Sequence, residues 1–162
     1  PNGDIMLSFR KNSMIIVVDK KSKKVSKQWQ DNAWGQQHDC TLLENGNVLF
    51  FANGIHVPGG IFYSKVIEFD WDSGDEVWSY TGWPLWSLFS PNISGAQRLA
   101  SGNTLICEGG KGCLFEVTPA GEIVWEYVSP YDVNHSVFGE VNWIFRALRY
   151  APDAPELQGR FR

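Results

Sequence analysis

His38 is the histidine whose neighbours in the sequence best suit chemistry. It stands in the tripeptide Gln-His-Asp, next to Asp39, at the expected start of a strand. An imidazole beside a carboxylate can be oriented to act as a nucleophile or general base near neutral pH. The same pair can instead satisfy buried hydrogen bonds between neighbouring sheets, so both interpretations stay open. The other two histidines are His56, within an insertion, and His135, after the last repeated segment.

Three arginines belong to short sequences that we expect to form innermost strands. They are Arg98 in Gln-Arg-Leu, and Arg146 and Arg149 in Phe-Arg-Ala-Leu-Arg-Tyr. Guanidinium groups that line a channel would suit an anion such as sulfate, because unpaired arginines repel one another unless an anion or solvent compensates. Salt bridges between neighbouring sheets are the alternative role for the same side chains.

The cysteines do not indicate a metal site. Cys40, Cys107 and Cys113 have no metal-ligand spacing, and no cofactor motif is evident. We therefore expect no metal and no cofactor. Cys107 and Cys113 flank a glycine-rich turn, and both a disulfide and two free thiols are compatible with that spacing.

The composition is that of a compact domain. The chain has 162 residues, of which 43% are hydrophobic, and this length can bury a sizeable core. With 14 Lys and Arg against 18 Asp and Glu, the net charge of -4 lacks the broad positive field that non-specific nucleic-acid binding needs. The longest apolar runs, 14–18 and 48–52, are far shorter than the roughly 20 residues of a membrane-spanning helix. We expect neither a nucleic-acid partner nor a membrane span.

An internal repeat determines which elements must position these side chains. Each repeat has a turn containing glycine, two apolar strands, a polar turn and a strand with tryptophan, and the three copies cover 2–29, 45–80 and 101–128. Trp29, Trp78 and Trp125 are 49 and 47 residues apart, the period of a propeller blade. Small sheets with apolar residues on both faces must pack between two neighbouring sheets. The sequence therefore predicts an all-β chain with the fold of a β-propeller.

The strands can be counted from the same pattern. The predicted blades are about 1–30, 39–83 and 95–130, within a propeller domain of 1–157 that is followed by a tail at 158–162. Blades two and three have four strands each, whereas the first lacks an innermost strand. Residues 145–150 resemble the innermost strands, so we predict that they complete the first blade. The predicted strands are 5–9, 14–19, 24–29, 39–43, 47–52, 65–70, 76–80, 95–99, 103–107, 113–118 and 122–128.

Three blades are too few to close a ring at normal strand twist. We therefore expect this chain to be about half of a ring. Either a second copy pairs head to tail, each copy supplying the other's missing strand, or an N-terminal half that is absent from this sequence completes the ring.

Several strings of residues resemble the arylsulfotransferase-like β-propeller family. The resemblance covers most of 1–157 and corresponds to the C-terminal half of the family's propeller. The matching strings are 37–39, 43–54, 94–99, 102–109, 115–127 and 145–150.

The resemblance implies a six-bladed propeller that is periplasmic or secreted. It implies transfer of a sulfuryl group from an aryl sulfate to a phenolic acceptor through a transiently sulfated channel histidine. By position, His38 matches the catalytic histidine, while Arg10 and Asn53 match channel-facing residues that bind substrate. The start of the chain has no basic region followed by an apolar core, so we expect no signal peptide within it.

The chain also departs from the family pattern. Residues 94–97, Ser-Gly-Ala-Gln, stand where a further axial histidine is expected. A non-catalytic propeller that serves as a binding or assembly module is therefore the alternative function. The two functions differ in one geometric requirement, because an anion-transferring site needs a convergent set of side chains: His38, Arg10, Arg98 and Arg146.

Overall fold

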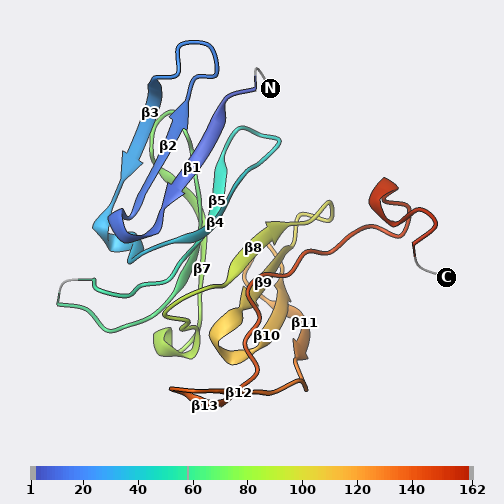
Figure 1. The fold of residues 1–162 in the computed structure, drawn as a ribbon. Helices are drawn as coiled ribbons and strands as arrows, with labels where there is room; N and C mark the ends of the chain where they lie inside the picture. Colours follow the sequence, from blue (N-terminus) through green and yellow to red (C-terminus); the bar gives the residue numbers. More distant parts are fainter. Residues whose placement is uncertain (1–2, 58, 161–162) are drawn as a thin grey trace.

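The computed structural model describes residues 3–57 and 59–160, and these form four antiparallel sheets (Figure 1). Asn2 of the first predicted turn and residues 161–162 of the predicted tail lie outside the described residues. Helical structure in the described ranges consists of five 3-10 helices of three residues each: η1 (Arg10–Asn12), η2 (Asn32–Trp34), η3 (Leu85–Ser87), η4 (Gly109–Lys111) and η5 (Pro155–Leu157). The all-β prediction is confirmed.

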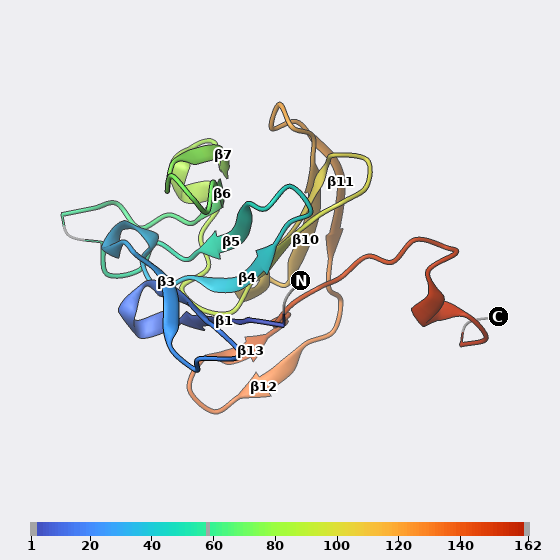
Figure 2. The same ribbon diagram turned by 90° about the horizontal axis from the view of Figure 1, so that it is seen from above.

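Three of the sheets are propeller blades. The first has the order β1 (Ile5–Phe9), β2 (Met14–Val18), β3 (Val25–Gln30). The second has the order β4 (His38–Leu42), β5 (Val48–Ala52), β6 (Lys65–Phe69), β7 (Glu76–Thr81). The third has the order β8 (Gly95–Arg98), β9 (Thr104–Glu108), β10 (Cys113–Val117), β11 (Ile123–Val128). The predicted strands match these to within one residue at each end. Seen from above, the three sheets fan out as an arc (Figure 2).

The turns explain why the same elements recur. Gly46 and Gly102 have φ values of +89° and +87°, a left-handed conformation that glycine adopts without strain. Each lies in a tight turn closed by equivalent backbone hydrogen bonds, from Leu43 N to Asn47 O and from Leu99 N to Asn103 O. These turns place the innermost strands β4 and β8 side by side in neighbouring blades.

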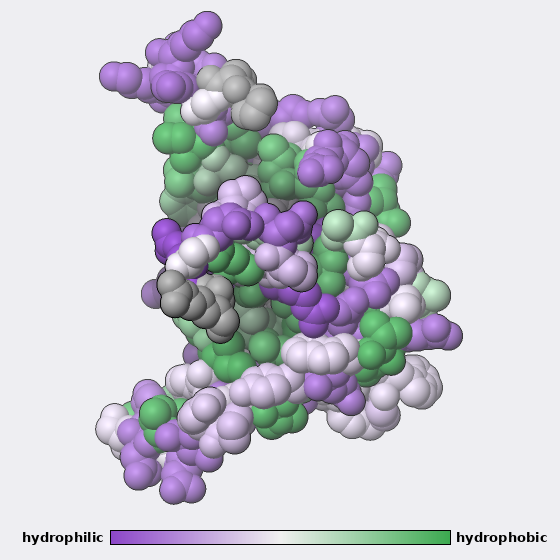
Figure 3. Space-filling model, turned by 90° about the vertical axis from the view of Figure 1, so that its right-hand side faces the viewer, coloured by the Kyte–Doolittle hydropathy of each residue, from purple (hydrophilic) through white to green (hydrophobic). Residues whose placement is uncertain are grey.

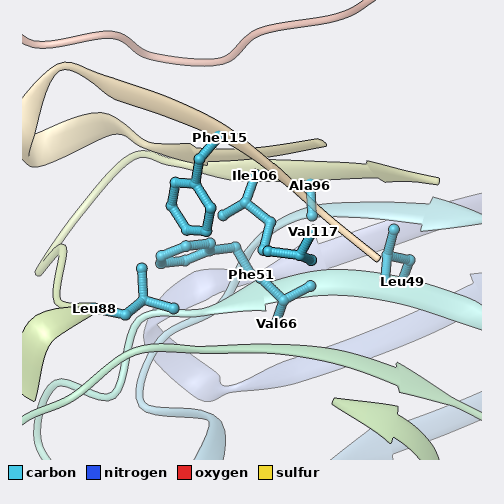
Figure 4. Close-up of a cluster of buried hydrophobic side chains, with 8 residues drawn as sticks. All are labelled: Leu49, Phe51, Val66, Leu88, Ala96, Ile106, Phe115 and Val117. Atoms are coloured by element: carbon cyan, nitrogen blue, oxygen red, sulfur yellow. The ribbon is translucent and has the colours of Figure 1, made fainter. Parts of the chain in front are cut away.

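The core consists of two apolar layers, one on each face of β5. Val48, Phe50 and Ala52 point toward the first blade, and Leu49 and Phe51 point toward the third, as the two-residue period of a strand requires. Between the second and third blades the buried cluster comprises Leu49, Phe51, Val66, Leu88, Ala96, Ile106, Phe115 and Val117 (Figure 4). Between the first and second blades it comprises Ile15, Val48, Phe50, Ala52, Ile67 and Phe69.

The tryptophans connect the blades, although their register differs from the prediction. Trp78 and Trp125 lie opposite Glu68 and Glu116 in corresponding positions, whereas Trp29 lies two residues further along its strand, opposite Ile15. The indole Nε1 of Trp29 donates to Trp71 O at 3.0 Å, and that of Trp78 donates to Pro119 O at 2.9 Å. Both carbonyls belong to the equivalent turn of the next blade. Trp29 and Trp78 therefore reach the neighbouring blade from two different positions in the strand ladder.

Residues 145–150 do not form the predicted strand with β1 within this chain. Among the described residues, β1 pairs in a ladder with β2 alone. The C-terminal segment instead lies along β8, where Ser94 N donates to Phe145 O at 3.1 Å and the Gln97 side chain bonds both backbone groups of Arg149. It therefore lies beside the third blade, where the innermost strand of a following blade would lie (Figure 1). Its pairing with a second copy stays a prediction.

A short hairpin, β12 (Val133–His135) and β13 (Gly139–Val141), follows the third blade and was not predicted. His135 packs there against Phe138 and Trp143, with ring centroids 5.0 Å and 5.3 Å away. The hairpin lies at the same end of the sheets as η4 (Figure 1).

Apolar surface is left uncovered on the face from which the C-terminal segment projects (Figure 3). Exposed large apolar side chains occur on both outer blades and on the C-terminal segment, and they include Ile5, Leu7, Phe9, Val124, Tyr127, Val128, Phe145 and Leu148.

Candidate functional site

One end of the inner strands brings together most of the predicted site residues. His38 begins β4, Asn53 directly follows β5 and Arg10 directly follows β1. Arg146 approaches the same end from the C-terminal segment, where it reaches Asp39. We call this the His38 site.

His38 is held by Asn53. The imidazole Nδ1 lies 2.6 Å from Asn53 Oδ1. The amide nitrogen of Asn53 donates to Ser90 O at 2.8 Å and to Ile93 O at 3.1 Å. Carbonyl oxygens accept hydrogen bonds and cannot donate them, so the amide nitrogen must face these two and Oδ1 must face the imidazole. Nδ1 of His38 is therefore the donor, and the lone pair of the neutral ring lies on Nε2.

The surroundings favour the neutral form of this histidine. Burial lowers the pKa of His38 below its ordinary value, and the positive charge of Arg10 acts in the same direction. The hydrogen bond with Asn53 opposes this in part, as do a backbone group of Gln36 and the charge of Asp39. The net direction leaves an uncharged imidazole near neutral pH.

Asp39 is not the partner of His38, so the orienting pair considered from the sequence is not formed. The Asp39 carboxylate accepts from Arg146 Nη1 at 3.2 Å and is largely buried against Gly95. Burial raises the pKa of Asp39, and the contact with Arg146 acts against that increase. Asp39 has φ = +56° and lies in a bulge of β4 between His38 and Thr41, and this irregular backbone directs the two adjacent side chains to different partners.

The same contact explains why the third blade has no axial histidine. Gly95 pairs with Cys107 at the ladder position that His38 occupies opposite Phe51. A side chain at Gly95 would collide with the Asp39 carboxylate. The Ser-Gly sequence there is a packing requirement of the His38 site.

Arg10 is only partly satisfied. Its Nη2 donates to Pro91 O at 3.4 Å, and its Nε is buried without a hydrogen-bond partner in the described part of the chain. None of the ion pairs found among residues 3–57 and 59–160 includes Arg10. A guanidinium in this state retains donors for an anion.

Arg98 lies elsewhere, at the far end of β8. Its Nη2 bonds Glu68 Oε2 at 2.7 Å, its Nη1 donates to Gly102 O at 3.1 Å, and its guanidinium stacks over Trp78 at 4.6 Å from the ring centroid. Four side chains were predicted to converge, and the structure brings together His38, Arg10 and Arg146 with Asn53 but leaves Arg98 out.

Arg149 repeats this arrangement one blade further on. It bonds Glu116 and stacks over Trp125 at 4.8 Å from the ring centroid. The carboxylates are held in turn by asparagines, since Asn47 donates to Glu68 and Asn103 to Glu116, each at 2.7 Å. We call these two sets the Glu–Arg–Trp clusters. The sequence left salt bridges between sheets open as the role of Arg98 and Arg149, and the structure shows that role. The glutamate, asparagine and tryptophan partners were not identified, although Asn47 and Asn103 follow glycine in both turns.

The remaining candidates for chemistry are inert. The three cysteines are free, which excludes the disulfide between Cys107 and Cys113 that the spacing left open. Burial raises the pKa of Cys40 and of Cys107 to about 12, so both are protonated thiols.

The described residues contain neither a metal-binding cluster nor a membrane-spanning helix. No group of three or more His, Cys, Asp or Glu side chains in 3–57 and 59–160 is arranged to hold a metal ion. In the same ranges there is no helix with the length and apolar character to cross a membrane.

Comparison with known proteins identifies the fold alone. No family model matches the chain, and no curated protein matches it. A streptogramin B lyase structure is similar over 80% of this chain and 38% of its own, with 18% identity and a TM-score of 0.55. A protein of unknown function from Bacteroides caccae is similar over 78% of this chain and 42% of its own, with 14% identity and a TM-score of 0.52. These are propeller-type folds, and the chain spans about two fifths of each.

Proposed function

We propose that the His38 site binds a small anion of the aryl sulfate class and that Nε2 of His38 carries its sulfuryl group to a phenolic acceptor. One observation carries the proposal. His38 donates a hydrogen bond from Nδ1–H to Asn53, and this places the lone pair of the neutral ring on Nε2 in a site that also holds Arg10. An imidazole lone pair is a competent nucleophile at neutral pH.

The transfer has two balanced steps. In the first, Nε2 forms a bond to sulfur while the bond from sulfur to the aryl oxygen breaks, and the released phenolate takes a proton from solvent. In the second, the oxygen of a phenolate acceptor bonds to sulfur while the nitrogen–sulfur bond breaks, which restores the neutral imidazole. The Asn53 oxygen accepts the hydrogen bond from Nδ1–H in both steps and so stabilises the positive ring of the sulfated form.

The arginines have different parts in this proposal. Arg10 would bind the sulfate oxygens, because it has donors left and no carboxylate partner among the described ion pairs. Arg146 would contribute charge at the edge of the site while its Asp39 pair orders the C-terminal segment. Arg98 has no part in binding. The proposal needs no metal or cofactor, and it includes the periplasmic or secreted location that the family resemblance implies.

The test is release of 4-nitrophenol from 4-nitrophenyl sulfate in the presence of a phenol. The single chain and any larger assembly that it forms in solution are assayed separately. In parallel, the melting temperature is measured with and without inorganic sulfate. We expect His38→Ala to abolish release and leave the fold intact, and His135→Ala to behave as wild type. Absence of release together with absence of a thermal shift would refute the proposal.

A non-catalytic assembly module is the second candidate. The Glu–Arg–Trp clusters favour it, because they use Arg98 and Arg149 to join neighbouring elements. The exposed apolar side chains of β1 and β11 also favour it. Native mass above that of the single chain, without turnover or a sulfate-induced thermal shift, would support this function.

A further inference from the structure

Asn53 connects His38 to the segment that joins the second and third blades. It is fully buried, and its side chain bridges the imidazole and the carbonyls of Ser90 and Ile93. We propose that Asn53 is a positioning residue that holds His38 in the tautomer with the proton on Nδ1. Its assignment as a substrate-binding residue, which the family resemblance suggested, is replaced by this role.

The backbone around Asn53 is fixed independently of His38. Ser64 donates its hydroxyl to Asn53 O at 2.9 Å, and the same hydroxyl accepts from Ser90 N at 2.9 Å. Ser90 in turn accepts, through its hydroxyl, from Gly110 N at 2.9 Å. Both the carbonyl and the side-chain amide of Asn53 are therefore restrained, so the amide cannot rotate without breaking several buried hydrogen bonds.

The conformation of the connecting segment serves this arrangement. Ile93 has φ = +50° and Ser94 has φ = +81°, in the left-handed region. For a β-branched residue such as Ile93 this conformation is strained, and such strain is a recognised mark of functional sites. Here it presents the Ile93 carbonyl to the Asn53 amide. Strain in the connection is thus coupled to the orientation of one imidazole.

In the described part of the chain, the charged side chains nearest His38 do not supply the same restraint. Asp39, the neighbour in sequence, is bonded to Arg146 and packed on Gly95. Arg10 has donors only and cannot accept a hydrogen bond from Nδ1–H of His38. Without Asn53, a neutral imidazole would distribute its proton between the two nitrogens, and the fraction with a free Nε2 would fall.

The experiment is long-range ¹H–¹⁵N spectroscopy of protein labelled in its histidines, at a pH where His38 is neutral. The His38 signals are assigned by their loss in His38→Gln. We expect wild type to show a pyrrole-like Nδ1 and a pyridine-like Nε2, and Asn53→Ala to show averaged signals of the two tautomers. Asn134→Ala, on an exposed residue of β12, is the matched control and should change nothing.

Two results would overturn the inference. One is a protonated Nε2 in wild type, and the other is an unchanged pattern in a folded Asn53→Ala variant. If Asn53→Ala fails to fold, the wild-type spectrum alone decides the question. The inference rests on the proposed function only in one respect, namely that Nε2 is the atom that attacks sulfur. A correct tautomer without sulfuryl transfer would therefore refute that function and leave the positioning role standing.

Discussion

The two ends of the inner strands are built on different principles. At the far end, two successive blade boundaries use the same Glu–Arg–Trp cluster, and each arginine there has a carboxylate partner. At the near end, where the His38 site lies, equivalent ladder positions hold different residues, such as His38 in one blade and Gly95 in the next. Repetition therefore marks what holds blades together, and the break in the repeat marks the candidate site.

The comparison also separates arginines that look alike in sequence. Arg98 and Arg149 are neutralised and stacked on indole rings, so they contribute to the blade boundaries. Arg10 has no carboxylate partner among the described ion pairs and lies where the repeat is broken. A guanidinium without a carboxylate partner has more charge and more donors left for an anion than a paired one.

The largest effect is expected from removing the C-terminal segment. Deletion of 143–162 takes away Arg149, the partner of Glu116 and Trp125, and exposes the inner face of β8. We expect a chain that fails to fold or to assemble, measured by soluble yield and native mass. Unchanged solubility and unchanged native mass would show that the segment does not act as the innermost strand of a blade.

Breaking one far-end cluster should also be costly. Glu68→Ala leaves Arg98 without its carboxylate and two asparagines without their acceptor. We expect a loss of roughly 3 kcal/mol in the free energy of unfolding, measured by urea denaturation. His38→Ala should cost less than about 1 kcal/mol, because a partly buried imidazole adds little to the core. Equal losses in the two variants would remove the distinction between the two ends.

His38, at the near end, should make the free energy of unfolding depend on pH. The pKa of His38 is lowered by folding, so the unfolded chain binds more protons between that lowered value and about 6.5. Stability should therefore rise with pH through this window and level off above it. His38→Gln should flatten the rise, measured by thermal unfolding at several pH values. A variant with the same slope as wild type would mean that His38 does not titrate differently on folding.

The smallest effect concerns the thiols between the two ends. Burial raises the pKa of Cys107 to about 12, and its Sγ contacts the carbonyl of Ile144. Iodoacetamide at pH 8 should label Cys107 in unfolded protein and leave it unmodified in native protein, as measured by mass spectrometry. Reductant should leave the melting temperature unchanged because the cysteines are free. Rapid native labelling would indicate that the C-terminal segment opens.

Sequence reasoning found the blades because their signals are local. Glycine turns and alternating apolar residues depend on neighbours a few positions apart, so the strands of residues 5–128 were placed correctly. The partner of His38 was not found, because Asn53 reaches it only after β4 and β5 pair around a bulge. Adjacency in the sequence favoured Asp39 instead. In each Glu–Arg–Trp cluster the arginine lies 30 or more positions from its glutamate, so the pair cannot be identified within one repeat.

The indole hydrogen bonds have a consequence for spectroscopy. Trp29 and Trp78 each tie the rim of one blade to the next, so their fluorescence will change if blades separate one at a time during unfolding. Trp125 is 41% exposed and has no such carbonyl among the described residues. Its emission should shift to shorter wavelength when a further blade docks beside the third. One intrinsic fluorophore in this chain can thus report closure of the ring without a label.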